Sequence, residues 1–214
     1  MMIRGDRLGS LGSREGNARG ERTRKALLEA AGSVFAGAQY GDARLLDIST
    51  VAGVNAGLIH FHFGNKEDLA AELLNEYRSR IDAVFASSSY EVSAADRIIR
   101  AFKELARVIA SDPILQAGLS LSLLPPAALA KVSQAPTAAW REAAAVMVRE
   151  GIEDGSVHPN ADPEALASFI YDLFVGAQVI SGTSNQWTSF PDEAERLALL
   201  VQAQLKDPVW KIEG

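Results

Sequence analysis

From about Glu21 to nearly the end of the chain, apolar residues recur at intervals of three and four positions. This spacing places apolar side chains on one face of a helix. Runs of alternating β-branched residues bounded by turn signals, which would predict strands, are not found in the sequence. The pattern therefore predicts an all-α fold.

Residues that favour helix ends divide this pattern into separate helices. Asn65, Ser93 and Asp162 stand where N-caps are expected, and Asp112-Pro113 joins a cap to a proline suited to the first helical position. The expected helices cover about 21–38, 65–86, 93–111, 113–124, 140–155, 163–181 and 191–206, with two short helices between residues 45 and 63.

The first 20 residues are rich in Gly, Ser and Arg and lack this periodicity, which predicts a flexible arm. Residues 1–25 hold seven Lys or Arg and three Asp or Glu, a net charge of +4. The remaining residues hold 14 Lys or Arg and 24 Asp or Glu, a net charge of −10. A basic arm on an acidic body indicates a polyanionic partner at one end of the molecule. A solvated, disordered tail is the alternative.

Composition excludes several classes of protein. The chain has 214 residues, of which 48% are apolar, enough for one or two packed cores and too many for a disordered tail. It contains no cysteine, which excludes disulfides, cysteine-ligated zinc and thiol nucleophiles. No apolar stretch approaches the roughly 20 residues that span a bilayer, and the N-terminal residues lack the apolar core of a secretory signal. We therefore expect a cytoplasmic protein without a membrane partner.

Three residues between positions 45 and 63 lie at the offsets of a helix-turn-helix: Ser49, Gly53 and Ile59. The two helices of this motif cross closely, so the contact position on the first must be small, as Ser49 is. The turn needs a residue that tolerates a positive φ, which glycine does because it lacks a Cβ. Ile59 is the expected buried anchor of the second helix, and Asn55 is its expected cap. An ordinary helical hairpin with a glycine turn is the alternative.

The second helix of the pair is the predicted recognition helix, whose first turn would enter a DNA major groove. Its expected base-reading residues are Asn55, Ala56, Leu58, His60 and Phe61. His60 and His62 face different directions on a helix, so they cannot share a metal ion. We predict no metal site and no cofactor. An all-α enzyme would need a cluster of acid–base groups or a nucleophile motif, and the sequence offers neither, so we expect no enzymatic activity.

The same region resembles a known family. The resemblance is carried by Leu28-Glu29-Ala30-Ala31, Val34-Phe35, Ala52-Gly53-Val54, Phe61-His62-Phe63 and Lys66-Glu67-Asp68-Leu69. From about Arg22 to Leu74 the chain resembles the N-terminal domain of the tetracycline-repressor (TetR) family. The resemblance implies a homodimeric repressor on a palindromic DNA operator, released by a ligand bound in a C-terminal helical domain.

This resemblance also implies the domain organisation. Residues 1–20 would form the basic arm, and residues 21–68 a three-helix DNA-binding domain that contains the helix-turn-helix. Residues 69–214 would form a helical bundle for ligand binding and dimerisation.

Parts of the C-terminal half resemble one subgroup of the family, the γ-butyrolactone receptors of actinobacteria. They are the segment 112–118, Trp140-Arg141-Glu142 and Val175-Gly176. Proteins of this subgroup sense small lactone or furan-type autoregulators, and the tryptophan that matches Trp140 lines their ligand pocket. The resemblance implies a lactone- or furan-like inducer in a mostly apolar pocket. The expected ligand-binding residues are Phe85, Phe102, Gln116, Leu119, Thr137, Trp140, Phe174 and Gln178.

Several positions depart from the family pattern. Ala43 and Arg44 replace the usual Thr/Ser pair that caps the first helix of the motif and touches phosphate, with Asp42 as a substitute cap. Ala56 replaces a frequent Lys, and His60 a frequent Tyr. Each lost phosphate contact weakens binding to all DNA sequences alike. The alternative function is therefore a receptor that binds ligand but lacks specific DNA binding. The expected phosphate contacts are Arg22, Arg24, Lys25, Arg44 and Lys66.

The helix expected at 163–181 and the last helix are apolar on more than one face. A surface helix of a monomer needs only one apolar stripe. The excess predicts a homodimer interface built from these two helices. Central helices of a monomeric bundle are the alternative.

Overall fold

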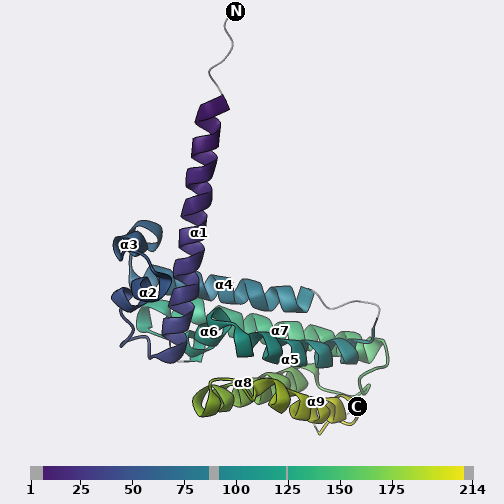
Figure 1. The fold of residues 1–214 in the computed structure, drawn as a ribbon. Coiled ribbons are helices and arrows are strands. Elements are labelled where there is room, and N and C mark those ends of the chain that lie inside the picture. Colours follow the sequence, from purple (N-terminus) through teal and green to yellow (C-terminus); the bar gives the residue numbers. More distant parts are fainter. Residues whose placement is uncertain (1–6, 87–91, 124, 210–214) are drawn as a thin grey trace, which may run out of the picture.

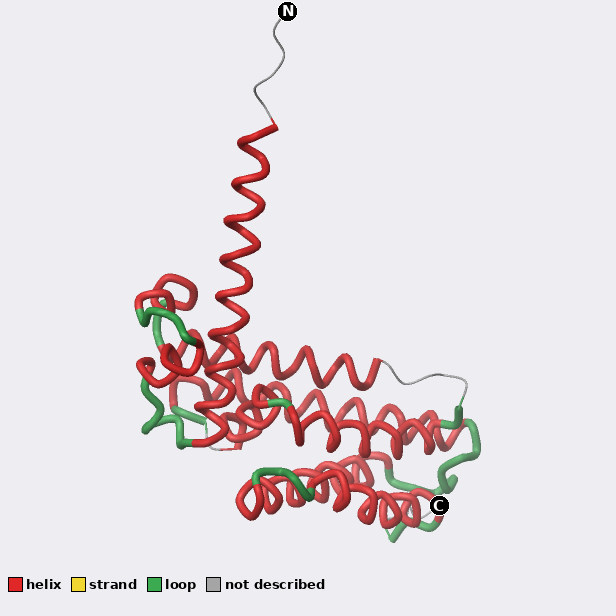
Figure 2. The backbone as a smooth tube through the Cα atoms, in the orientation of Figure 1, coloured by secondary structure: helices red, strands yellow, loops and turns green. Residues whose placement is uncertain are grey.

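The structure is a computed structural model that describes residues 7–86, 92–123 and 125–209, with side chains described except at 7–16, 131–137 and 185. Within these residues the regular elements are helices, which confirms the predicted all-α fold (Figure 2). They are α1 (Arg7–Gly37), α2 (Leu45–Ala52), α3 (Gly57–Phe63), α4 (Lys66–Ala86), α5 (Ala94–Ser111), α6 (Pro113–Leu123), the 3₁₀ turn Ala127–Leu129, α7 (Ala130–Glu153), α8 (Pro163–Asn185) and α9 (Phe190–Lys206).

The predicted caps start four of these helices. Side-chain oxygens of Asn65 and Ser93 accept hydrogen bonds from backbone N–H groups three residues later, at 2.8 and 3.2 Å. Asp112 accepts from the N–H of Ile114 at 2.9 Å, and Asp162 accepts from two N–H groups at 3.0 Å. Each bond satisfies a backbone donor that the helix itself leaves unpaired.

Two predicted helix starts are wrong. α1 begins at Arg7 rather than Glu21, so the expected flexible arm is helical over residues 7–20, while residues 1–6 lie outside the described part. α1 extends away from the rest of the molecule over this stretch (Figure 1). The packed part of α1 already bears the cost of helix nucleation, and each further residue adds a backbone hydrogen bond. α7 begins at Ala130, before the expected start at Trp140.

The buried residues form two main cores that share α4. The N-terminal core joins α1, α2 and α3 to the first half of α4, and it includes residues of α6 such as Ile114 and Leu121. The C-terminal core joins the second half of α4 to α5, α7, α8 and α9. Tyr77 of α4 packs against both cores. α4 therefore connects the two halves of the molecule directly.

α6 makes a second connection between the halves, because it packs along α1 and also against α4 and α7. It crosses α1 at Gly32, where a Cβ atom would lie 3.0 Å from atoms of Pro113 and Ile114. Contact this close leaves little room for α6 to move independently of α1.

The expectation that no apolar stretch is long enough to span a bilayer is wrong for α8. Its segment Pro163–Ser184 is long and apolar enough to cross a membrane, by length and composition alone. The helix instead packs against α7 and α9 at one edge of the bundle (Figure 1). Its apolar character follows from burial on this side together with exposed apolar side chains on another. The exposed apolar residues of α8 and α9 are Val179, Ile180, Leu199 and Leu200.

Candidate nucleic-acid interface and ligand cavity

The turn between α2 and α3 has the geometry that the sequence predicts. Gly53 takes a left-handed conformation with φ of 65°, and the N–H of Val54 donates to the carbonyl of Ser49 at 3.0 Å. Ser49 is 3% exposed and Ile59 is fully buried. A small residue at the helix contact, a glycine in the turn and a buried anchor therefore meet as expected.

α3 lies at the edge of the molecule beside α1 (Figure 1). Phe61 is 79% exposed there, an unusual position for a large aromatic side chain. His60 and Asn55 are exposed, and Ala56 and Leu58 are half-buried. The N-cap residue of α3 is Ala56 rather than the expected Asn55, although Oδ1 of Asn55 accepts from the N–H of Gly57 at 2.8 Å. Of the predicted base-reading residues, Leu58, His60 and Phe61 thus share one short helix, and Asn55 and Ala56 directly precede it.

The two histidines of α3 differ in their surroundings. Nδ1 of His60 lies 2.7 Å from the carbonyl oxygen of Gly64, so it donates to a carbonyl at the end of the helix. His62 is half-buried and meets the ring of Phe61 edge-on, with the ring centres 5.0 Å apart. His62 is therefore a partly buried residue that packs against Phe61. His60 is exposed while one of its ring nitrogens is already bonded.

The predicted phosphate contacts fall into two groups. Arg22, Lys25 and Arg44 are exposed, the first two on α1 and Arg44 directly before α2. Arg24 instead forms an ion pair with Glu72 at 2.6 Å, and its guanidinium lies over the ring of Phe63. A role for Arg24 inside the domain is thus visible in the structure.

The ammonium of Lys66 also faces the protein. It donates to the carbonyls of Tyr40 and Ala43, at 2.7 and 2.9 Å. A phosphate contact by Lys66 would have to compete with these two bonds, so Lys66 serves first to fix the loop before α2. The expectation that Asp42 caps α2 is wrong: Arg44 is the N-cap residue, and no side chain completes the cap by a hydrogen bond.

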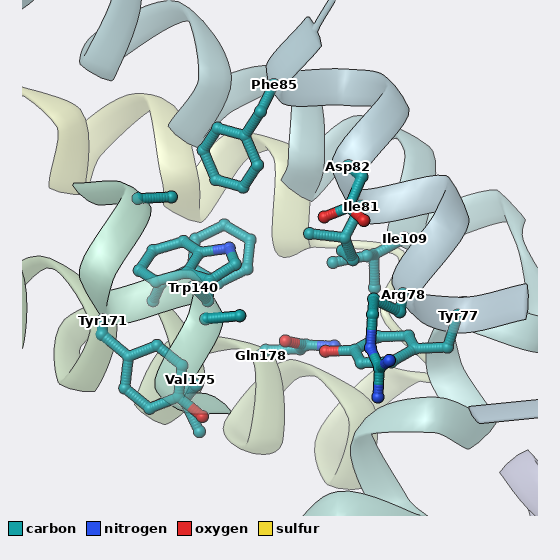
Figure 3. A pocket seen from close by; sticks show the side chains of 13 residues that line it. Tyr77, Arg78, Ile81, Asp82, Phe85, Ile109, Trp140, Tyr171, Val175 and Gln178 are labelled. Atoms are coloured by element: carbon teal, nitrogen blue, oxygen red, sulfur yellow. The ribbon is translucent and has the colours of Figure 1, made fainter. Parts of the chain in front are cut away.

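In the C-terminal half a cavity lies between α4, α5, α7 and α8 (Figure 3). Four of the predicted ligand residues line it: Phe85, Trp140, Phe174 and Gln178. The other lining residues are Tyr77, Arg78, Ile81, Asp82, Ile109, Ala139, Ala143, Tyr171 and Val175.

Aromatic rings fill most of this space. The ring of Trp140 meets Phe85 and Tyr171 edge-on, at centre distances of 5.8 and 5.1 Å, and it stacks on Phe174 at 5.9 Å. These are favourable geometries for ring pairs. The free volume is about 50 Å³, room for only one or two water molecules. A molecule with several carbon atoms enters only if these rings move.

The polar atoms of the cavity contrast with its walls. Gln178 is 2% exposed, and its Nε2 has no hydrogen-bond partner; Nε of Arg78 is likewise buried without one. A buried unpaired donor costs about 1–3 kcal/mol. Burial raises the pKa of the Tyr77 hydroxyl, which therefore stays neutral at physiological pH. The cavity thus offers hydrogen bonds along one side.

The remaining predicted ligand residues lie elsewhere. Phe102 packs behind Phe174 in the core, with ring centres 5.0 Å apart, and does not line the cavity. Gln116 and Leu119 face a separate hollow of about 240 Å³ beside Trp187, and Nε2 of Gln116 donates to the carbonyl of Ile109 at 2.9 Å. Phe102, Gln116 and Leu119 follow the apolar spacing of their helices, but they lie on helix faces that do not line the cavity. The side chain of Thr137 lies outside the described residues.

Helical spacing could have found some of the residues that sequence reasoning missed. Tyr171, Phe174, Val175 and Gln178 stand at positions i, i+3, i+4 and i+7 of α8, so they share one face. Since Phe174 and Gln178 were predicted, Tyr171 and Val175 follow from them. Arg78 gives no comparable signal, because an arginine on a long helix usually lies in solvent.

An ion pair connects the cavity helix to the start of α6. The guanidinium of Arg80 contacts the carboxylate of Asp112 at 2.5 Å and that of Glu76 at 2.8 Å. Burial lowers the pKa of Arg80, but the bonds to Glu76 and Asp112 outweigh it and leave the pKa raised. Asp112 thus holds α4 while it caps α6. Among the described residues no group of three His, Asp or Glu side chains is placed to hold a metal ion.

Comparison with known proteins agrees with this arrangement. Residues 27–73 match the family model for bacterial regulatory proteins of the tetR family, and residues 92–205 match that for the tetracyclin repressor-like C-terminal domain. The A-factor receptor protein of Streptomyces griseus is 29% identical over 164 residues, which cover 77% of this chain and 56% of that protein. The chain thus matches little more than half the length of this relative.

Two solved structures show the same fold over most of both chains. The native tylp structure, a tetr regulator from Streptomyces fradiae, has a TM-score of 0.71 and 25% identity, covering 89% of each chain. A gamma-butyrolactone receptor described as an ArpA-like protein has a TM-score of 0.68 and 25% identity, covering 85% of this chain and 99% of that one.

Proposed function

The chain belongs to the tetR family of bacterial regulatory proteins, and we propose that it is a homodimeric transcriptional repressor that a small molecule releases from its DNA operator. It would act in the cytoplasm, without a cofactor and without catalysis. The observation that carries the proposal is that one long helix, α4, packs against the exposed short helix α3 and also lines the aromatic cavity of the C-terminal bundle.

DNA reading is assigned to the exposed side of α3. Phe61 and His60 reach solvent from a helix that Ile59 and the Gly53 turn hold in place, and Asn55 reaches solvent from the turn just before this helix. Such a helix fits a major groove and contacts base edges with its first turn. The exposed basic residues Arg22, Lys25 and Arg44 would hold the phosphates on either side.

Dimerisation is assigned to α8 and α9. Ile180 is 66% exposed, Leu199 66% and Leu200 53%, and large apolar groups exposed on two helices that pack together are typical of a protein interface. A two-fold dimer would present two copies of α3, which suits a palindromic operator.

The inducer site is assigned to the cavity around Trp140. The two related receptors are named for A-factor and for gamma-butyrolactone, so a lactone- or furan-like molecule is the first candidate. Entry of such a molecule would displace Trp140 and its neighbours and shift α4. A ligand releases DNA only if it favours a conformation in which the two copies of α3 no longer match the operator.

A gel shift at several salt concentrations tests the proposal. The probe is DNA from upstream of the protein's own gene, with random DNA of equal length as the control. We expect retardation of the specific probe at salt concentrations where random DNA is free, and its reversal by at least one compound in a panel of lactones and alkylfurans. Specific retardation that no compound reverses would contradict the inducer role.

Equal retardation of both DNAs would favour the second candidate, a receptor without specific DNA binding. Ala43 and Ala56 favour this candidate because neither can contact a phosphate through its side chain. So does His60, whose Nδ1 is bonded to Gly64.

A further inference from the structure

The polar side of the cavity carries two hydrogen-bond donors without an acceptor. They are Nε2 of Gln178 and Nε of Arg78, both buried and both unpaired. The two residues come from different helices, α8 and α4, yet line the same space. Donors from separate elements that converge on one cavity are the arrangement of a binding site for an oxygen-rich group.

The rest of the cavity is apolar and aromatic. Figure 3 shows Arg78, Tyr77 and Gln178 on one side of the space, with Phe85 and Trp140 on the other. A molecule that satisfies both sides has a polar head and a hydrocarbon tail.

The charge of Arg78 favours an anionic head. Among the described residues Arg78 is in no ion pair. By contrast, Arg80 of α4 pairs with Asp112, and Arg141 of α7 pairs with Asp172. A guanidinium offers paired N–H donors that match the two oxygens of a carboxylate. A neutral lactone carbonyl accepts hydrogen bonds but does not balance this charge.

Asp82 is the one other charged group that lines the cavity. It lies one turn beyond Arg78 on α4 and is exposed, so water screens it better than a buried carboxylate. It would repel an anionic head weakly. Removing its charge should therefore strengthen the binding of an anion and leave the binding of a neutral molecule unchanged.

We propose that the inducer is an amphiphilic carboxylate, with its head held by Arg78 and Gln178 and its tail among Phe85, Trp140 and Phe174. This inference rests on the proposed function, because it takes the cavity as the inducer site. It changes the chemistry of the preferred ligand from a neutral lactone to an anion. The competing explanation is that one or two water molecules in the 50 Å³ space satisfy both donors.

Calorimetric titration of the full-length protein with decanoate, 1-decanol and γ-decalactone, which have equal numbers of carbon atoms, decides between them. We expect decanoate to bind about tenfold more tightly than either neutral compound. Arg78→Gln abolishes this preference, Arg78→Lys restores part of it, and Asp82→Asn increases it. Arg100→Gln on α5, whose side chain is exposed, is the matched control and changes nothing.

Each outcome decides one way. Tighter binding of γ-decalactone than of decanoate overturns the anionic head and leaves the proposed function standing. A preference for decanoate that Arg78→Gln leaves intact also overturns the assignment. If none of the three compounds binds, the cavity is not a site for such amphiphiles and the inference fails, while the gel shift still tests DNA binding. If Arg78→Gln does not fold, the exposed Asp82→Asn variant still tests the charge of the head. An increased preference for decanoate supports an anionic head, and an unchanged preference overturns it.

Discussion

The ring of Tyr77 on α4 lies directly against Gly118 of α6, so close that a Cβ atom at residue 118 would overlap ring atoms. Tyr77 also lines the cavity. α6 packs in turn along α1, the first helix of the DNA-reading half. Tyr77 therefore touches the candidate ligand space and the helix that meets the DNA-reading half.

The Gly118→Ala variant tests this contact. The added methyl group forces Tyr77 to move, and we expect a loss of about 1–3 kcal/mol in the free energy of unfolding, as for other overpacked sites. Thermal unfolding monitored by circular dichroism measures it. Gly20→Ala, a helical glycine with no atom within 4 Å of the added Cβ, is the control and should not lower the midpoint, because alanine favours a helix more than glycine does. An unchanged midpoint in Gly118→Ala would show that the α4–α6 contact is looser than described.

Helix periodicity and caps predicted most of this fold, because the residues that form the pattern in the sequence also form the helices and their ends in the structure. Asp112 and Asp162 cap their helices through local backbone contacts that depend only on neighbours in the chain. The start of α1 could not be predicted in this way. Glycines at 9, 12, 16 and 20 lower the helix propensity of the stretch, whereas its helicity follows from continuity with the packed part of α1.

The cavity shows where sequence reasoning reaches its limit. Apolar residues at helical spacing identify a buried face but not the partner of that face, so Phe102 and Phe174 look alike in the sequence. In the structure Phe174 lines the cavity and Phe102 packs behind it. The helix-turn-helix was predictable in more detail because its contacts span few residues and require a glycine in the turn.

Phe61→Ala should weaken operator binding and leave the fold intact. The side chain is 79% exposed, so the protein loses little burial when it is removed. Full burial of a Phe side chain is worth about 1.5–3 kcal/mol, so loss of its contact with a base edge should lower the affinity roughly tenfold or more. Fluorescence anisotropy with labelled operator DNA measures it. Val209→Ala, at another exposed apolar position, is the control. Equal affinities for Phe61→Ala and the wild type would remove Phe61 from the interface.

The basic residues of α1 should govern the salt dependence of DNA binding. Arg19, on the helical extension, and Arg22, just after it on α1, are exposed, so phosphates can reach them. Replacing each by Gln should lower the slope of log affinity against log salt by about one unit or less, equally for specific and random DNA. Arg107→Gln on α5, an exposed arginine paired with Glu104, should leave the slope unchanged. A slope that stays constant in both α1 variants would place this extension away from DNA.

Asp154 should make a small, acid-sensitive contribution to stability. A hydrogen bond from the Ser156 side chain and one from the backbone N–H of Ala94 hold the pKa of Asp154 below its ordinary value. Because the folded state favours the charged form, the contribution is present above the unfolded pKa of about 3.9 and is lost as pH falls through the lower folded pKa. Asp154→Asn should therefore destabilise the protein at neutral pH and less below pH of about 4. Urea unfolding at both pH values measures the difference, and a constant difference would contradict the assignment.

Charges placed on the exposed apolar surface of α8 and α9 should separate the proposed dimer. Ile180 is 66% exposed and Leu200 53%, and an interface that covers them would have to bury an unpaired carboxylate in Ile180→Glu or Leu200→Glu. We expect sedimentation velocity to show a monomer for both variants and a dimer for the wild type. Val146→Glu on α7, at an apolar position that is 40% exposed, is the control and should stay dimeric. Because an operator with two half-sites gains affinity from both copies of α3, the monomeric variants should also lose specific retardation. A dimer that survives both substitutions would place the interface on another surface.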